Sequence, residues 1–232
     1  MKLSGLHLSF YLTLLALFFT LILFEFSPLD LMIQDLFFNS STQSWLIDRN
    51  QTLLKFVLYD GIKIAYVLLV FALICVLIFF RSHKKIALYR QGLIIVLFST
   101  ICIPLFVSSL KAVTNTPCPK NIIQYAGMYP YVSVFDKFPK GDKPDKNFRC
   151  FPAGHASGGF ALMSLFFLFK TPRAKKVVLS TAILLGWVTG TYKMLIGDHF
   201  LSHTLVTMEI AWLFIIFFHS TFNPKQDNPK QD

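Results

Sequence analysis

Long apolar stretches alternate with short polar segments along this chain. Six runs are almost free of Asp, Glu, Lys and Arg: residues 6–24, 64–80, 92–110, 151–169, 177–192 and 200–218. A bilayer core of about 30 Å requires about 20 helical residues, and a helix satisfies its own backbone hydrogen bonds in lipid. The pattern therefore predicts an all-α, polytopic membrane protein.

We expect one domain of residues 1–222 with six transmembrane helices, at about 6–26, 61–80, 91–111, 154–170, 176–195 and 199–219. Lys2 is the only basic residue before the first run, and no small-residue cleavage site follows the run. We therefore expect a retained span rather than a signal peptide. The segment 223–232 repeats Asn-Pro-Lys-Gln-Asp twice, which predicts a disordered cytoplasmic tail.

The composition narrows the class of protein further. Apolar residues make up 54% of the 232 residues and charged residues 15%, against about 25% charged in soluble domains. This excludes a disordered chain, and four Cys are too few for a disulfide-stapled miniprotein. The net charge of +10 alone allows a nucleic-acid partner, but the apolar excess argues against one and favours a lipid bilayer.

Basic residues in short loops predict the orientation. Arg81, Lys84, Lys85 and Arg90 separate the second and third runs, and Lys170, Arg173, Lys175 and Lys176 separate the fourth and fifth. Short loops rich in Lys and Arg stay cytoplasmic. We therefore expect both termini in the cytoplasm, a location in the inner membrane, and the segments after the first, third and fifth runs on the outer face.

Two polar segments are expected on that outer face. In residues 27–63, the spacing of Leu31, Ile33, Leu36 and Phe37 predicts a short amphipathic helix on the membrane surface. Cys118 and Cys150 bracket the second segment, on the oxidising side of the membrane. They are either a disulfide or two free thiols.

Three clusters of polar residues mark the outer ends of the spans: Lys111-x6-Cys118-Pro119, Phe151-Pro152-Ala153-Gly154-His155, and Lys193-x5-His199-x3-His203. The amides at the helix start around Gly154 lack helical partners, which favours an anion, and Lys111 and Lys193 add positive charge. His199 and His203 are one helical turn apart, so their rings share a face. Together with His155 they suit nucleophilic attack on phosphorus and protonation of a leaving oxygen.

At these residues the sequence resembles the type-2 phosphatidic acid phosphatase superfamily of membrane lipid phosphatases. The family motifs are Lys-x6-Arg-Pro, Pro-Ser-Gly-His and Ser-Arg-x5-His-x3-Asp, and the resemblance runs from about Lys111 to Leu205. It implies hydrolysis of a lipid phosphate monoester or diphosphate, of the lipid A, undecaprenyl diphosphate or phosphatidylglycerol phosphate type, with no metal or other cofactor.

The resemblance also implies the role of each residue. His199 would form a phosphohistidine and His155 would act as the general acid. Lys111, Lys193 and the backbone amides of Ala153 and Gly154 would hold the phosphate.

Four positions differ from the family motifs. Cys118 replaces Arg, Ala153 replaces Ser, Tyr192-Lys193 replaces Ser-Arg, and His203 replaces the Asp that orients the nucleophile. A neutral imidazole at His203 still accepts a hydrogen bond from His199. As a hypothesis, Arg149 folds back to supply the missing guanidinium.

Other interpretations stay open at this point. The three His residues also have the character of zinc ligands, which would make a zinc-dependent membrane hydrolase. A lipid phosphotransferase and a non-catalytic lipid-phosphate binder use the same motifs. For two acidic residues we expect structural roles: Asp198 as a cap of the last helix, and Glu209 paired within the bundle.

Overall fold

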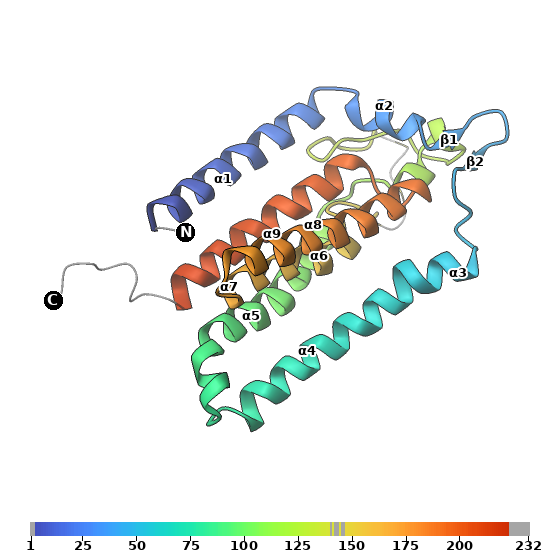
Figure 1. Ribbon diagram of the computed structural model, residues 1–232. Coiled ribbons are helices and arrows are strands. Elements are labelled where there is room, and N and C mark those ends of the chain that lie inside the picture. The colour runs from blue at the N-terminus through green and yellow to red at the C-terminus, as the bar shows by residue number, and fades with distance from the viewer. Residues whose placement is uncertain (1–2, 140, 142–143, 145–146, 223–232) are drawn as a thin grey trace.

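Long helices dominate the computed structural model, which describes residues 3–139, 141, 144 and 147–222. Five helical segments are long and apolar enough to cross a membrane (Figure 1). They are α1 (Leu3–Glu25), the continuous segment of α3 (Thr52–Lys55), a π-helical stretch (Phe56–Gly61) and α4 (Ile62–Phe79), then α5 (Lys84–Val113), α8 (Pro172–Leu195) and α9 (Leu201–Phe222).

The sixth expected span is a shorter apolar segment, Gly154–Leu168. It consists of α6 (Gly154–Ala161), a 3-10 turn (Leu162–Ser164) and α7 (Leu165–Leu168). The only sheet in the described part of the chain is the antiparallel pair β1 (Phe38–Asn39) and β2 (Ser44–Trp45). The all-α membrane fold is therefore confirmed, whereas the count of six spans stays a prediction. The expected tail, 223–232, lies outside the described residues.

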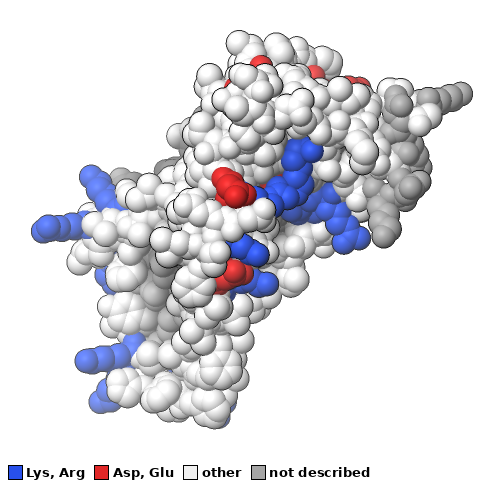
Figure 2. Space-filling model, turned by 90° about the vertical axis from the view of Figure 1, so that its right-hand side faces the viewer, with Lys and Arg blue, Asp and Glu red and all other residues white. Residues whose placement is uncertain are grey.

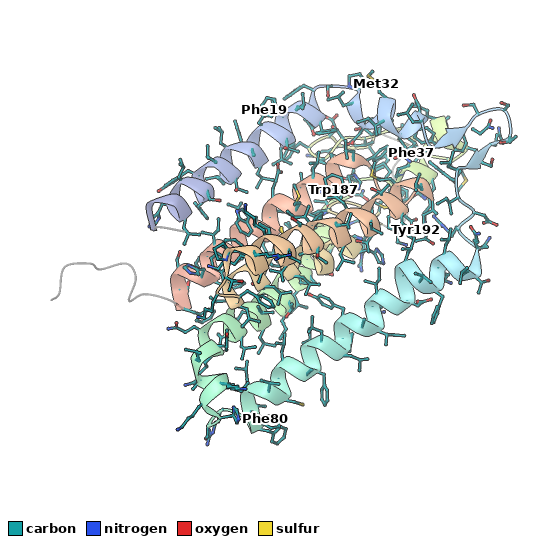
Figure 3. The ribbon with its side chains drawn as sticks, in the orientation of Figure 1. Phe19, Met32, Phe37, Phe80, Trp187 and Tyr192 are labelled. Carbon is teal, nitrogen blue, oxygen red and sulfur yellow. A yellow bond between two sulfur atoms is a disulfide. The ribbon has the colours of Figure 1, made fainter. Side chains whose placement is uncertain are left out.

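Large apolar side chains cover the outside of the bundle. Phe19 on α1 and Phe80 after α4 point away from the other helices (Figure 3), and both are more than half exposed. A soluble protein rarely exposes a continuous apolar surface of this kind. The exposed side chains therefore agree with a multi-pass membrane protein.

Helix α6 lies at the centre of the bundle, between α5, α8 and α9. Its Phe160 is fully buried in a core with Ile103 of α5 and Ile215 of α9. Gly159 allows the close contact with α8, because a Cβ on it would lie 2.6 Å from the Gly186 amide nitrogen. This packing fixes the start of α6 between the ends of α5, α8 and α9.

One carboxylate inside the bundle, that of Glu209, is paired with a neighbouring helix. Thr20 on α1 donates a hydrogen bond of 2.9 Å to Glu209 Oε1 on α9. The expectation that Glu209 faces the bundle and pairs internally is confirmed, and its partner is Thr20.

The connecting segments gather at one end of the bundle, opposite the turns that join α4 to α5 and α7 to α8 (Figure 1). Helix α2 (Leu29–Asp35) and the β1–β2 hairpin lie at this end, as does the loop between α5 and α6. Cys118 and Cys150 form a disulfide with a Cα–Cα distance of 5.3 Å, so the thiol alternative is wrong. The bond closes the loop that holds the first and second motifs together.

Helix α2 differs from the expected amphipathic surface helix. Its polar residues Asp30 and Gln34 are buried, whereas Leu36 is 72% exposed. Asp30 accepts hydrogen bonds from the amide and hydroxyl of Ser202, and Gln34 donates to the Met194 carbonyl at 2.9 Å. Contacts with α8 and α9 therefore orient α2 with its polar side inward.

Candidate active site

The turn between α8 and α9 sets the position of the third motif. Gly197 has a φ of +73°, a left-handed conformation that glycine adopts without strain. The Asp198 amide donates back to the Lys193 carbonyl at 2.7 Å, which closes the end of α8. Trp45 of β2 fills the space beside Gly197, where a Cβ would lie 2.3 Å from the indole. His199 therefore lies in this turn, before the first residue of α9.

His199 and His203 form a buried pair of imidazoles. Their Nδ1 atoms are 3.4 Å apart, and both side chains are almost completely buried. The His203 ring also hydrogen-bonds to the backbone of Cys150. Because His203 Nδ1 faces His199, we assign this donor to Nε2 of His203. His203 Nδ1 is then an acceptor for His199 Nδ1–H, and the lone pair of His199 is on its Nε2.

Burial keeps His199 uncharged. Loss of solvation, followed by the neighbouring His203, Lys111 and His155, lowers the pKa of His199 well below 6.5. The imidazole is therefore neutral near pH 7, which is the form that a nitrogen nucleophile requires.

His155 is the second residue of α6 and the most accessible of the three motif His residues. Its ring centroid lies 6.3 Å from that of His199 and 4.7 Å from that of Tyr59, which belongs to the π-helical stretch before α4. Short π-helical stretches often occur at functional sites. His155 thus lies between the buried His pair and the helix that forms the outer wall of the site.

Lys111, at the end of α5, reaches the start of α6. A Cβ on Gly154 would lie 3.3 Å from Lys111 Nζ, so glycine leaves this space to the ammonium group. The Ala153 amide, in contrast, is already used, since it donates to Thr207 Oγ1 at 2.8 Å and to the His203 carbonyl at 3.1 Å. Ala153 therefore ties α6 to α9, and the amides that remain for an anion are those after it.

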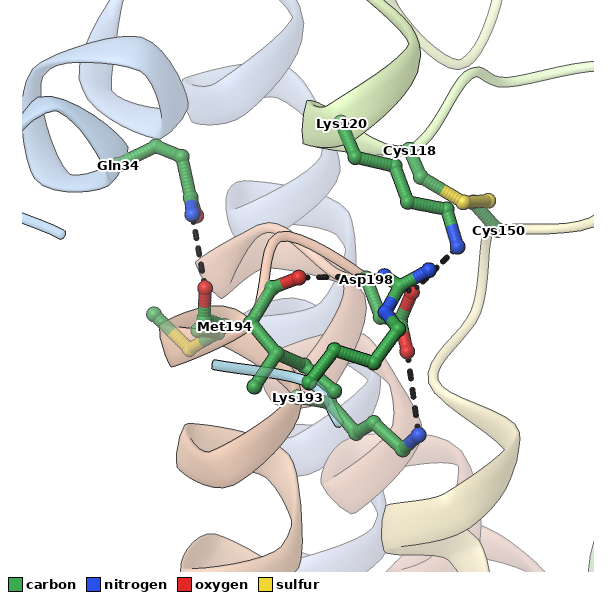
Figure 4. A network of polar contacts seen from close by, with 9 residues as sticks. Gln34, Cys118, Lys120, Cys150, Lys193, Met194 and Asp198 are labelled. Atoms are coloured by element: carbon green, nitrogen blue, oxygen red, sulfur yellow. Dashed lines mark hydrogen bonds and ion pairs between the residues drawn. A yellow bond between two sulfur atoms is a disulfide. The ribbon is translucent and has the colours of Figure 1, made fainter. Parts of the chain in front are cut away.

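Asp198 takes part in ion pairs, where the sequence had predicted a helix cap. Its Oδ1 accepts from Arg49 at 2.6 Å and from Lys120 at 2.7 Å, and its Oδ2 accepts from Lys193 at 3.1 Å (Figure 4). We call these four residues the Asp198 cluster. Burial would raise the pKa of Asp198, but the Lys120 hydrogen bond and the three positive charges hold it below its ordinary value. The carboxylate is therefore ionised at neutral pH.

Comparison with known families agrees with this geometry. The sequence model of the PAP2 superfamily matches residues 92–227, which is more than half of the chain and includes all three motifs. The chain belongs to the PAP2 superfamily. Its members are phosphatases that act on phosphate esters, so the resemblance seen in the motifs is confirmed. Comparisons with curated proteins and with solved structures give no match.

The structure brings the predicted residues of all three motifs together at the starts of α6 and α9, and we call this region the PAP2 site. The role of Arg149 stays a prediction. Arg149 is exposed, and no hydrogen bond or ion pair joins it to another described residue. Arg49, from the segment between β2 and α3, lies in the Asp198 cluster instead. Sequence reasoning missed Arg49, Lys120 and Tyr59. Only Lys120 carried a signal, because it directly follows the motif pair Cys118-Pro119.

The described part of the PAP2 site does not present a group of three or more His, Cys, Asp or Glu side chains arranged to hold a metal ion. The His199 and His203 nitrogens that face each other are joined by a hydrogen bond. His155 faces Tyr59 rather than completing a ligand set with them.

An apolar cavity of about 580 Å³ adjoins the PAP2 site. It lies between α4 on one side and α5, α6 and α8 on the other, with Tyr66, Pro104 and Leu162 among its lining residues. Lys111 and His155 also line it. Charged groups and apolar walls therefore meet in one space, which suits an amphipathic molecule.

Proposed function

We propose that this PAP2 protein is a membrane lipid phosphatase that works through a phosphohistidine intermediate. The observation that carries the proposal is the place of His155, between the neutral His199 and the apolar cavity. A phosphate beside His199 would have its lipid portion on the His155 side, with the apolar chain in the cavity. The general acid and the departing oxygen would then be adjacent.

The proposed reaction has two steps. In the first, His199 Nε2 attacks phosphorus and the bond between phosphorus and the lipid oxygen breaks. His155, which takes up a proton when the phosphate anion binds beside it, gives that proton to the lipid oxygen. In the second, water attacks the phosphohistidine and gives a proton to His155, which releases inorganic phosphate. His203 accepts a hydrogen bond from His199 Nδ1–H and so stabilises the positive charge that develops on the ring.

Positive groups would hold the phosphate during both steps. Lys111 approaches from α5 and Lys193 from α8, and the amides that follow Ala153 are at the start of α6. Fixed donors of this kind stabilise the charge of the transition state without reorganisation. We therefore propose that neither a metal nor another cofactor is required.

A purified-protein assay tests the function. We expect phosphate release from a lipid phosphate in micelles, full activity in the presence of EDTA, and loss of at least about a thousandfold in His199→Ala. Acid-labile phosphate bound to the wild type, absent in His199→Ala, would identify the phosphohistidine. Inhibition by chelators would support the zinc alternative. Transfer of phosphate to a second lipid in place of release would support a phosphotransferase, and lipid binding without turnover would support a non-catalytic binder.

We further propose that the site faces the outside of the inner membrane, with both termini in the cytoplasm. The two basic segments lie at the opposite end of the bundle, beside the start of α1 and the end of α9 (Figure 1). Single-cysteine labelling in intact cells tests this orientation. A cysteine at Thr42 should react with an impermeant reagent, whereas one at Ser82 should not.

A further inference from the structure

A second, much smaller cavity adjoins His203, and we call it the His203 cavity. Its volume is about 10 Å³, and residues of α1, α2, α9 and the loop between α5 and α6 line it. It shares no lining residue with the apolar cavity, and neither His155 nor His199 is part of its wall. The His203 cavity therefore reaches the buried pair of imidazoles through His203.

Asp30 of α2 brings a carboxylate to the wall of the His203 cavity, although it is only 4% exposed. The amide of Ser202, the residue before His203 in α9, donates to Asp30 Oδ1 at 2.9 Å, and the Ser202 hydroxyl donates to Oδ2. Thr116 also lines the cavity, and its buried hydroxyl has no hydrogen-bond partner among the described residues. A polar cavity of this size has room for about one water molecule. Asp30 and His203 are therefore neighbours across a small polar space.

Asp30 lacks a basic partner. Figure 2 shows basic side chains grouped beside acidic ones on one face of the protein, whereas no Lys or Arg of the described residues forms an ion pair with Asp30. The titratable groups that face Asp30 from the neighbouring elements are Glu25 of α1, Tyr125 and Tyr131 of the loop between α5 and α6, and His203 of α9. Of these groups, only His203 can become positively charged.

The proposed reaction creates such a positive charge on His203. When His199 Nε2 bonds to phosphorus, the proton on His199 Nδ1 moves to His203 Nδ1, 3.4 Å away. The carboxylate of the family motif would be neutralised by this proton, whereas the neutral imidazole of His203 becomes a cation. A buried cation is costly unless a negative charge lies near it.

We propose that Asp30 acts through His203 and supplies the negative charge that the family motif has at position 203. The inference rests on the proposed function and adds a positioning residue to it. Ionised Asp30 stabilises the His203 cation across the His203 cavity while His199 carries the phosphate. When water has attacked phosphorus and the bond to His199 Nε2 breaks, the proton returns from His203 Nδ1 to His199 Nδ1. Asp30 itself neither gains nor loses a proton during the cycle.

The activity test compares the full-length wild type with Asp30→Asn, which still accepts from the Ser202 amide but has no charge. At pH 8, kcat for phosphate release should be at least about tenfold lower in Asp30→Asn, with KM changed less than about twofold. The two kcat values should converge at pH 5, because burial raises the pKa of Asp30 to about 6 and the charge is lost as the pH falls through that value. All other groups titrate in both proteins, so the ratio of the kcat values isolates Asp30.

Asp35→Asn is the matched control. Asp35 belongs to the same helix and accepts from the Tyr125 hydroxyl at 2.8 Å, but it lies outside the His203 cavity, so kcat should stay unchanged. A kcat ratio of one at both pH values would overturn the proposal. A loss in Asp30→Asn that is equally large at pH 5 and pH 8 would also overturn it, because a purely structural role does not depend on the charge.

A carboxylate at position 203 tests whether Asp30 acts through His203. His203→Asp restores the residue of the family motif, so adding Asp30→Asn to this variant should change kcat less than about twofold. A loss as large as that in the wild-type background would refute the proposal.

The same variants measure the interaction without catalysis. Two carboxylates across the His203 cavity repel each other when both are ionised, so His203→Asp should lower the unfolding temperature more at pH 8 than at pH 5. Asp30→Asn should reduce this extra loss at pH 8, and an extra loss of the same size in both backgrounds would refute the interaction. If Asp30→Asn reduces it while the wild type hydrolyses no lipid phosphate, the phosphatase function fails and the pairing of Asp30 with position 203 stands.

Discussion

His203 Nδ1 lies 3.4 Å from His199 Nδ1, so an imidazole occupies the position where the family motif has a carboxylate. A carboxylate holds the tautomer of its partner by charge, whereas an imidazole must itself be held in one tautomer. The hydrogen bond to the Cys150 backbone does this for His203. The variant motif therefore depends on the loop that ends at Cys150.

This relationship predicts how substitutions at His203 behave. His203→Asn keeps an acceptor oxygen for His199 Nδ1–H and should lose about tenfold in kcat, whereas His203→Leu has no acceptor and should lose at least about a hundredfold. Steady-state phosphate release from each purified variant measures the difference. Similar activity in the two variants, both eluting as the wild type does from a sizing column, would contradict the orienting role.

The disulfide should matter to activity as well as to stability. Closing a loop with a sequence separation of 32 residues contributes about 3 to 4 kcal/mol in the chain-entropy model. Because the Cys150 backbone also hydrogen-bonds to the His203 ring, reduction of the disulfide should lower both the unfolding temperature and kcat. The double variant Cys118→Ser plus Cys150→Ser should match the reduced wild type and be insensitive to reductant, while Cys75→Ser serves as a control. Unchanged kcat after complete reduction would separate the disulfide from catalysis.

The spans and the His motifs were predictable because their signals are local. A run of apolar residues long enough for a bilayer needs no partner to be recognised, and His199-x3-His203 keeps its spacing in any context. The orientation of helix α2 was not predictable. Its Asp30 and Gln34 are buried through hydrogen bonds with Ser202 and Met194, which lie far away in sequence. The sequence pattern predicted that the apolar side of α2 would be buried. Contacts between distant segments bury its polar side instead.

The basic residues of the site illustrate the same limit. Arg149 was a reasonable hypothesis because it adjoins Cys150 in sequence, yet it is exposed. Arg49 joins Asp198 across 149 positions of the chain, through the fold of the β1–β2 hairpin and the turn at Gly197. The spacing of residues within a motif cannot predict a pairing between positions so far apart in the sequence.

Gly197 should tolerate no larger residue. An alanine there would have to adopt a φ of +73°, and its Cβ would lie 2.3 Å from the Trp45 indole. We expect Gly197→Ala to lower the free energy of unfolding by about 2 kcal/mol or more and to reduce kcat, since the same turn carries Asp198 and His199. Gly141→Ala is the control, because it also has a positive φ but no atom lies within 4 Å of the added Cβ. Thermal unfolding and phosphate release measure both effects; equal destabilisation by the two variants would mean that Trp45 has no part in the result.

Asp30 should make stability depend on pH in a direction opposite to that of most carboxylates. Burial raises its pKa from 3.8 to about 6, in spite of the hydrogen bonds from Ser202. A carboxyl group with a raised pKa in the folded state contributes stability fully below pH 3.8 and loses it as the pH rises through 6. The wild type should therefore lose about 2.4 kcal/mol between pH 4 and pH 7 relative to Asp30→Asn, which does not titrate and still accepts from the Ser202 amide. Unfolding temperatures of the two proteins in detergent, measured from pH 4 to pH 8, give this difference directly. A constant gap between the curves would show that Asp30 is ionised throughout, and a gap that changes in the opposite sense would show that its ion is stabilised by the fold.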